Sequence, residues 1–160
     1  MTTLMVGFAF TMTCEGEWHL ERSGNPMRNS KKLLVATAFI AIVDDDKAVR
    51  SGLANLLKSA GYSTISFASS EDFLAYEEIE TLACAIFDVQ LSGMDGLDLQ
   101  EHLIAQHIAV PIIFLSAYAF EEIQARAKAN GAIAFLQKPV NTDTLLTCIL
   151  RIVESARDTH

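Results

Sequence analysis

Cysteine is scarce in this chain, and the three that occur lie far apart: Cys14, Cys84 and Cys148. An odd number of cysteines without a CxxC pair argues against a disulfide framework or a zinc site. Cys84 and Cys148 lie inside apolar runs, where a buried and unreactive thiol is expected. Together these features indicate a reducing, cytoplasmic setting.

Positive charge and long apolar stretches are also in short supply. Lysine and arginine number 12 against 20 aspartates and glutamates, so the formal net charge is −8. The basic residues are scattered, with Lys31–Lys32 the only adjacent pair. So acidic a chain is repelled by nucleic acid and by anionic lipid. No stretch reaches the ~20 apolar residues of a membrane span. We therefore expect neither direct nucleic-acid binding nor insertion into a membrane.

The first 35 residues differ from the rest, because no helical or strand period holds over them. We interpret 1–35 as an N-terminal extension, in part disordered, followed by a domain at 36–156 and a tail at 157–160. The basic stretch Met27–Lys32 and the apolar run Leu33–Val43 have the outline of a signal peptide. That apolar run ends directly in aspartates, and the predicted domain needs it as its first strand. We therefore favour a strand over a signal peptide.

From about residue 37 onward, short apolar runs alternate with amphipathic segments, without internal repeats or low-complexity tracts. Four apolar runs predict strands at Ala38–Val43, Ala83–Phe87, Pro111–Leu115 and Ala132–Leu136, and Ser63–Phe67 is predicted as a further strand, the second along the chain. Each is followed by a predicted helix: one from Asp46 to Gly61, a short one capped by Ser69 or Ser70 that carries Phe73, Leu74 and Ile79, one that carries Leu97, Leu99, Leu103 and Ile104, one at Glu121–Ala129, and one at Thr142–Ala156. In the last helix Leu145, Leu146, Ile149, Leu150 and Val153 are expected on the core side.

The five strand–helix units predict an α/β fold. Nearly continuous apolar strands imply a parallel sheet that is buried on both faces. We therefore expect a doubly wound, three-layer sandwich, and consider the flavodoxin-like strand order 2-1-3-4-5. In that order the first and third strands are neighbours, and ligands bind at the carboxyl ends of the strands.

Four of the strands lead into polar residues that converge at this edge. The first runs into Asp44–Asp46, of which Asp46 is interpreted as a helix cap; the third, fourth and fifth run into Asp88, Ser116 and Lys138. Clustered carboxylates disfavour one another's ionisation, so a cation is expected among them. Oxygen ligands suit Mg²⁺, which also binds phosphate oxygens. This set predicts phosphoryl transfer to Asp88 as the nucleophile, with the metal and Lys138 offsetting charge.

From about residue 38 to 155 the sequence resembles the receiver domain of two-component response regulators. Ile42–Asp46 carries the acid pair Asp44 and Asp45, and Phe87-Asp88 carries the phospho-accepting aspartate. The other matching motifs are Gly93-Met94-Asp95-Gly96, Leu115-Ser116-Ala117 and Phe135-Leu136-Gln137-Lys138-Pro139. The nearest type, judged from Ser70–Leu74 and Gly93–Leu97, is the receiver that is often joined to a helix-turn-helix output domain.

The resemblance implies a cofactor and its ligands. Asp45, Asp88 and the backbone carbonyl of Gln90 would hold Mg²⁺, with Asp44 acting through water. Lys138 would bind the phosphoryl group, and Pro139 would follow a peptide bond that is typically cis in the family.

The resemblance also implies a switch and its partners. The phosphoryl group would come from the phosphohistidine of a histidine kinase or a histidine phosphotransfer protein. Ser116 would then move toward the phosphate and the ring of Phe135 would turn inward, so that the face of the fourth helix, fifth strand and fifth helix changes its preference for a downstream protein. The domain would catalyse only its own phosphotransfer and slow dephosphorylation. A homodimer is a further option, through any exposed part of the last helix.

The chain departs from the family pattern in a few places. Ser92 stands where many members have proline, which we expect to loosen that turn. Gln90 and Tyr118 occupy variable positions that tune the lifetime of the phosphate. No output domain follows Ala156, so the chain is either a single-domain regulator or the receiver part of a longer protein.

Other functions remain open at this point. An aspartyl-nucleophile phosphohydrolase acting on small phosphate esters usually has a second acid two residues after the nucleophile, where this chain has Gln90. A nucleotide or flavin module needs a glycine- or hydroxyl-rich loop after the first strand, where this chain has aspartates. A receiver-like module that binds partners without phosphorylation would not need the Asp, Ser and Lys set.

Overall fold

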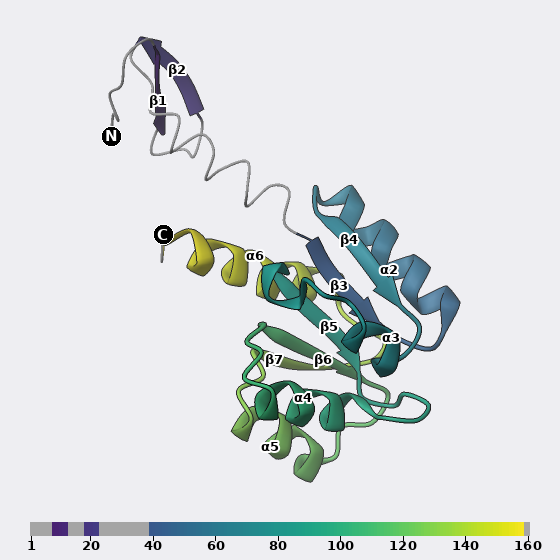
Figure 1. The fold of residues 1–160 in the computed structure, drawn as a ribbon. Coiled ribbons are helices and arrows are strands. Elements are labelled where there is room, and N and C mark those ends of the chain that lie inside the picture. Colours follow the sequence, from purple (N-terminus) through teal and green to yellow (C-terminus); the bar gives the residue numbers. More distant parts are fainter. Residues whose placement is uncertain (1–7, 13–17, 23–38, 159–160) are drawn as a thin grey trace. The chain divides into compact units, whose positions relative to one another are not determined.

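The computed structural model describes residues 8–12, 18–22 and 39–158, and the chain forms two compact units, Met1–Thr37 and Ala38–His160 (Figure 1). In the first unit, β1 (Phe8–Met12) pairs antiparallel with β2 (Trp18–Arg22). The prediction that no strand pattern holds over 1–35 is therefore wrong for these two segments. Each run is only five residues long, too short for a sustained period to mark it in the sequence. The expected disorder at 1–7, 13–17 and 23–35 falls outside the described residues.

The second unit is built on a parallel sheet. Its strands are β3 (Phe39–Val43), β4 (Ser63–Phe67), β5 (Cys84–Asp88), β6 (Ile112–Ser116) and β7 (Ala134–Gln137). Their order is β4-β3-β5-β6-β7, and every neighbouring pair is parallel. Counted from β3, this is the predicted order 2-1-3-4-5. The doubly wound prediction is confirmed.

The helices cover both faces of the sheet (Figure 1). They are α2 (Lys47–Ser59), α3 (Ser70–Leu74), α4 (Gly96–Ala105), α5 (Glu121–Ala129) and α6 (Thr142–Asp158). One core cluster joins the sheet to α2 and α6 through residues such as Leu57 and Ile149, and the other joins it to α3, α4 and α5 through residues such as Phe73 and Leu103. The central strands β3, β5 and β6 are buried almost throughout, so polar side chains on them are expected at the strand ends.

Two details of the helices differ from prediction. The short helix α3 ends at Leu74, because the amides of Ala75 and Tyr76 bond back to Glu71 and Phe73, and Ile79 reaches the core from a separate 3₁₀ turn, Ile79–Thr81. In α6 the expected core position Leu150 is 49% exposed, while Ile152 is buried. Helical spacing alone does not fix the rotation of a helix to within one residue.

A row of aromatic rings crosses one core from β4 to β7. Its members are Phe67, Phe73, Phe87, Phe114 and Phe135, with successive ring centroids 5.3, 5.1, 5.9 and 6.2 Å apart. Edge-on and tilted aromatic pairs at these distances stabilise a core beyond their buried area. The row ends at the half-buried Phe135, next to the polar edge of the sheet.

Helices α4 and α5 are also linked at the surface. The guanidinium of Arg126 donates to Asp98 Oδ1 at 3.1 Å and to Glu101 Oε1 at 2.8 Å.

Among the helices in the described part of the chain, none has the length and apolar character needed to cross a bilayer.

Candidate functional site

The first carboxylates of the site follow β3. Asp44 is only 1% exposed, and its Oδ1 accepts a hydrogen bond from the amide of Asp46 at 2.8 Å. Asp46 caps α2 by accepting from the amides of Ala48 and Val49, as predicted. Asp45 lies between them and is exposed. The three consecutive aspartates therefore have separate positions: Asp44 is buried, Asp45 is open to solvent and Asp46 caps the start of α2.

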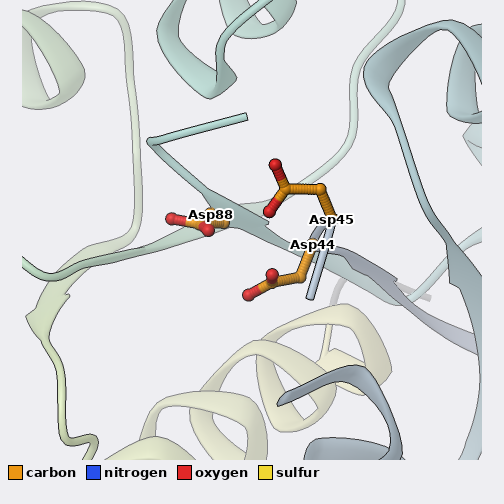
Figure 2. Close-up of side chains that lie close together, drawn as sticks. All are labelled: Asp44, Asp45 and Asp88. Atoms are coloured by element: carbon orange, nitrogen blue, oxygen red, sulfur yellow. The ribbon is translucent and has the colours of Figure 1, made fainter. Parts of the chain in front are cut away.

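The sheet brings a third carboxylate beside this pair. Asp88 is the last residue of β5 and is 6% exposed. Val43 of β3 is in register with Phe87 of β5, so the residues that follow them are neighbours. Oxygen atoms of Asp44, Asp45 and Asp88 lie within 4.8 Å of one another, and Figure 2 shows these carboxylates gathered at the strand ends.

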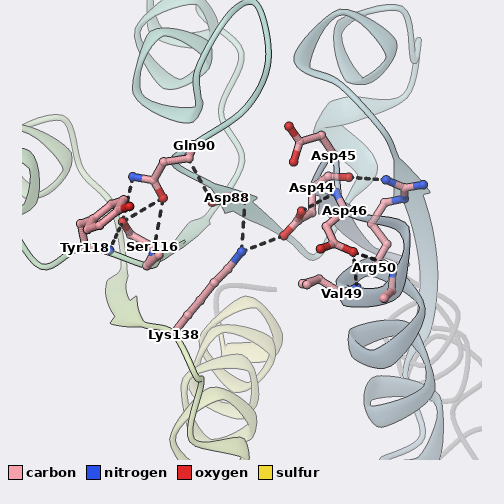
Figure 3. Close-up of polar contacts among 12 residues, drawn as sticks. Asp44, Asp45, Asp46, Val49, Arg50, Asp88, Gln90, Ser116, Tyr118 and Lys138 are labelled. Carbon is pink, nitrogen blue, oxygen red and sulfur yellow. Dashed lines mark hydrogen bonds and ion pairs between the residues drawn. The ribbon is translucent and has the colours of Figure 1, made fainter.

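Lys138 bridges two of these carboxylates. Its Nζ lies 3.1 Å from Asp44 Oδ2 and 3.2 Å from Asp88 Oδ2, and Figure 3 shows it reaching between them. The backbone amide of Lys138 donates to the carbonyl of Ser116, which fixes the start of this segment against β6. The Lys138–Pro139 peptide bond is cis. One ammonium thus balances part of the charge of three carboxylates.

Opposing effects determine the pKa values of Asp88 and Lys138. Burial, and then the charge of Asp44, raise the pKa of Asp88 above its ordinary value, and they outweigh the attraction of Lys138. Burial lowers the pKa of Lys138, but hydrogen bonds and charge from Asp44 and Asp88 outweigh that effect, so its pKa lies above the ordinary value. At neutral pH the lysine is a firmly held cation.

Ser116 ends β6 at the same edge, and its hydroxyl is engaged by Gln90. Ser116 is fully buried, and its Oγ lies 3.1 Å from Nε2 and 3.2 Å from Oε1 of Gln90. The amide of Tyr118 also donates to this Oγ at 3.1 Å. Figure 3 shows this group beside, but separate from, the Lys138 bridge. The backbone amide of Gln90 donates to Asp88 Oδ1 at 3.1 Å, so Gln90 touches both groups.

Three contacts of the site were not anticipated from the sequence. Arg50 donates to the backbone carbonyl of Asp44, and the side chain of Gln90 contacts Ser116. The amide and the hydroxyl of Ser92 donate to Asp45 Oδ2 at 3.3 and 3.0 Å. The contacts of Gln90 and Ser92 depend on how the loop between β5 and α4 folds, and the contact of Arg50 depends on its rotamer on α2. The only signal in the sequence was the departure of Ser92 from the proline of the family pattern.

The residues present fit a hard divalent cation. Asp44, Asp45 and Asp88 supply only oxygen ligands, which lie within 4.8 Å of one another. A single lysine does not neutralise three carboxylates. Oxygen ligands of this kind suit Mg²⁺, which binds proteins through a few carboxylates and keeps several waters.

The fold and the site define a receiver domain. Residues 40–150 match the family described as response regulator receiver domain, and the chain belongs to that family. Receiver domains of this family are phosphorylated by histidine kinases, bind Mg²⁺ at an acidic pocket and are typically signalling domains rather than enzymes. The chain therefore carries a receiver domain of the response regulator family, as predicted.

Similar proteins are transcriptional and response regulators. The chain is 33% identical over 120 residues to nodulation protein W of Bradyrhizobium diazoefficiens (75% of this chain, 53% of that protein). It is 37% identical over 123 residues to the transcriptional regulatory protein TdiR of Thauera aromatica (77% and 53%). The solved response regulator StyR has a TM-score of 0.70 at 36% identity (77% and 65%), and a CheY-like receiver domain from Methanospirillum hungatei has 0.70 at 29% (78% and 99%). The chain spans about half the length of these curated relatives.

Proposed function

We propose that Asp88 accepts a phosphoryl group from the phosphohistidine of a histidine kinase or a histidine phosphotransfer protein. The observation that carries this proposal is the bridge from Lys138 Nζ to both Asp44 and Asp88, at 3.1 and 3.2 Å, beside the exposed Asp45. A carboxylate nucleophile at the edge of a sheet, next to a cation and further acids, matches the needs of phosphoryl transfer.

The chemical step conserves charge and atoms. An oxygen of the Asp88 carboxylate attacks phosphorus, and the bond between phosphorus and the imidazole nitrogen of the donor breaks, leaving its electron pair on the ring. Lys138 offsets the charge that the transferring oxygens carry. The amide of Gln90 holds one oxygen of Asp88 and thereby orients the carboxylate.

Asp44, Asp45, Asp88 and the backbone carbonyl of Gln90 would hold Mg²⁺, with Asp44 acting through water. The ion would neutralise carboxylate charge and orient the phosphoryl oxygens. The buried Asp44 and Asp88 are fixed by Lys138 in advance, so little reorganisation is needed at these two ligands.

Phosphorylation would then change the protein–protein surface. Ser116 leaves Gln90 to bond the new phosphoryl group, and Phe135, at the end of the aromatic row, turns inward with it. The face of α5, β7 and α6 would present the change to a downstream protein, and a homodimer through this face is one option.

The domain would act in the cytoplasm and catalyse only its own phosphotransfer and dephosphorylation. We assign the domain to 36–156, with 1–35 as an extension and 157–160 as a tail.

Intact-mass measurement after incubation with acetyl phosphate and Mg²⁺ tests the proposal. We expect one added phosphate on the wild-type chain and none on Asp88→Asn. Beryllofluoride should change the spectroscopic signals of the wild type alone. The absence of both an adduct and a response to beryllofluoride would contradict the proposal and favour a module that binds partners without phosphorylation.

The same experiment separates the enzyme alternative. A phosphohydrolase would turn over a generic phosphate ester many times per protein molecule. The position two residues after Asp88 holds Gln90, whose amide contacts Ser116 and supplies no acid or base. We therefore expect no sustained release of phosphate from such esters.

A further inference from the structure

Ser92 makes a two-point contact with a carboxylate of the acidic cluster. Its hydroxyl and backbone amide donate to Asp45 Oδ2 at 3.0 and 3.3 Å. We propose that Ser92 is a positioning residue that holds Asp45 ready to share a divalent cation with Asp44 and Asp88. The inference rests on the cation site of the proposed function and deepens it, because it names a residue that sets the affinity of that site.

Asp45 needs such support more than the other two carboxylates do. Asp44 and Asp88 are buried, and each is held by Lys138 and by a backbone amide. Asp45 is exposed, and the contacts recorded for its carboxylate within the described chain both come from Ser92. An exposed aspartate samples several rotamers, and fixing one of them in advance lowers the cost of ordering it when a ligand binds.

The segment around Ser92 is fixed by the rest of the fold. On one side, the amide of Leu91 donates to the carbonyl of Val89, and the Leu91 side chain is buried. On the other side, Ser70 Oγ donates to the carbonyl of Met94 at 2.8 Å, and Glu71 accepts from the amide of Met94. Ser92 therefore acts from a loop tied to Val89, which directly follows β5, and to α3, so its contact can restrain Asp45.

The contact is compatible with a bound cation. An ionised carboxylate has about four acceptor sites on its two oxygens, and the donors of Ser92 use two of them. Both donors are neutral, so they restrain Asp45 without cancelling its charge. The opposite role would have the opposite effect. If Ser92 turned Asp45 away from Asp44 and Asp88, removing the Ser92 hydroxyl would tighten cation binding.

The affinity of the site for a divalent cation can be measured by titrating the full chain with Mn²⁺. The electron paramagnetic resonance signal of the free ion reports binding, and the titration is repeated in competition with Mg²⁺. We expect Ser92→Ala to weaken binding about tenfold, at the lower end of the effect of residues that orient metal ligands. Ser92→Thr keeps both donors and should stay within about twofold of the wild type. The control Ser59→Ala removes a similar hydroxyl, bonded to the carbonyl of Leu56 on α2, and should not change affinity.

A second readout separates positioning from damage to the fold. For Ser92→Ala, the Mg²⁺ concentration that gives half the maximal rate of modification by acetyl phosphate should rise about tenfold, while the rate at saturating Mg²⁺ stays within about twofold. A general loss of structure would instead lower the saturating rate.

The outcomes distinguish this inference from the function on which it rests. Equal or tighter cation binding by Ser92→Ala, or failure of Ser92→Thr to restore binding, overturns the role of Ser92 and leaves the cation site standing. If the wild type binds no Mn²⁺ or Mg²⁺, both the cation site and the role of Ser92 are overturned.

Discussion

Asp88 is a buried carboxylate whose neighbours act on it in opposite directions. Burial and Asp44 disfavour its charge, whereas Lys138 and the amide of Gln90 favour it, and the balance leaves its pKa raised. The folded state therefore holds a proton on Asp88 more tightly than the unfolded chain does. Stability is lost as the pH rises through the raised pKa, because Asp88 must then ionise in an unfavourable place.

Removing this charge should stabilise the domain. We expect Asp88→Asn to raise the free energy of unfolding at pH 7, without divalent cations, by on the order of 1 kcal/mol. The gain should disappear at a pH below the ordinary pKa of a carboxyl group, where the aspartate is neutral in both states. Urea unfolding at several pH values measures it. An unchanged or lower stability at pH 7 would show that the pairing with Lys138 outweighs burial.

Removing the charge of Lys138 should destabilise the domain, in contrast to Asp88→Asn. We expect Lys138→Ala to lower the free energy of unfolding at pH 7 by about 1–3 kcal/mol, because two buried carboxylates lose their cation. Since the pKa of Lys138 is raised, its stabilising contribution is complete below the ordinary lysine pKa and is lost as the pH rises through the raised value. Chemical unfolding with and without Mg²⁺ is the measurement, and Mg²⁺ should recover part of the loss.

The sequence predicted the members of this cluster better than their contacts. Asp44, Asp88 and Lys138 follow apolar runs, and parallel strands bring such positions to one edge whatever the loops do. Their direct contacts support that reasoning. The contacts of Ser92 and of the Gln90 side chain depend on loop conformation and side-chain rotamers, which no apolar period encodes. Their functional roles stay predictions.

At the scale of the element, the start of α4 is packed tightly against the end of β5. A Cβ at Gly96 would lie 2.4 Å from the carbonyl oxygen of Asp88, so this position has no room for a side chain. Asp95 caps the helix by accepting from the amide of Asp98 at 2.8 Å. The loop after Asp88 and the helix that follows are therefore held as one piece.

A pair of glycine substitutions tests this packing. We expect Gly96→Ala to destabilise the domain by about 2–4 kcal/mol, because backbone must shift to admit the methyl group. In Gly52→Ala the new methyl group meets nothing within 4 Å, and the position lies inside α2, so we expect a gain of about 0.5–1 kcal/mol. Thermal and urea unfolding of both variants gives the comparison. Equal effects would contradict the close approach at Gly96.

Element boundaries show what periodicity can and cannot specify. Helix α5 has the predicted bounds Glu121–Ala129, since Asn130-Gly131 ends it and Gly131 adopts a φ of +94°. Strand β4 also has its predicted bounds, Ser63–Phe67, whereas the other four strands shift by one or two residues, as between predicted Ala132–Leu136 and observed Ala134–Gln137. Ile79 lies on a separate turn and Leu150 is exposed, because tertiary packing decides the rotation and the end of a helix.

At the scale of the whole molecule, the chain comprises two compact units, which are Met1–Thr37 and Ala38–His160 in the sequence. The sheet, both core clusters and the acidic cluster all belong to the second unit. The hairpin of β1 and β2 belongs to the first, and a lone two-stranded hairpin has little stability of its own. The apolar pattern that starts near residue 37 predicts a domain boundary there, which stays a prediction, whereas the hairpin was not predicted.

A chain restricted to residues 38–160 should fold by itself. We expect its free energy of unfolding, extrapolated to zero urea, to lie within about 10% of that of the full chain, which is the usual uncertainty of such extrapolations. Its uptake of phosphate from acetyl phosphate should also match. A fragment that is unfolded, or that loses the reaction, would show that the first unit completes the domain.

Two kinds of ion pair coexist in this domain, and they differ in their response to ionic strength. The bridge of Arg126 to Asp98 and Glu101 lies in solvent, where salt screens charges over a Debye length of about 8 Å at 0.15 M. Lys138 and its carboxylates are largely shielded from solvent. Rising salt should therefore weaken the link between α4 and α5 well before it weakens the pairing of Lys138 with Asp44 and Asp88.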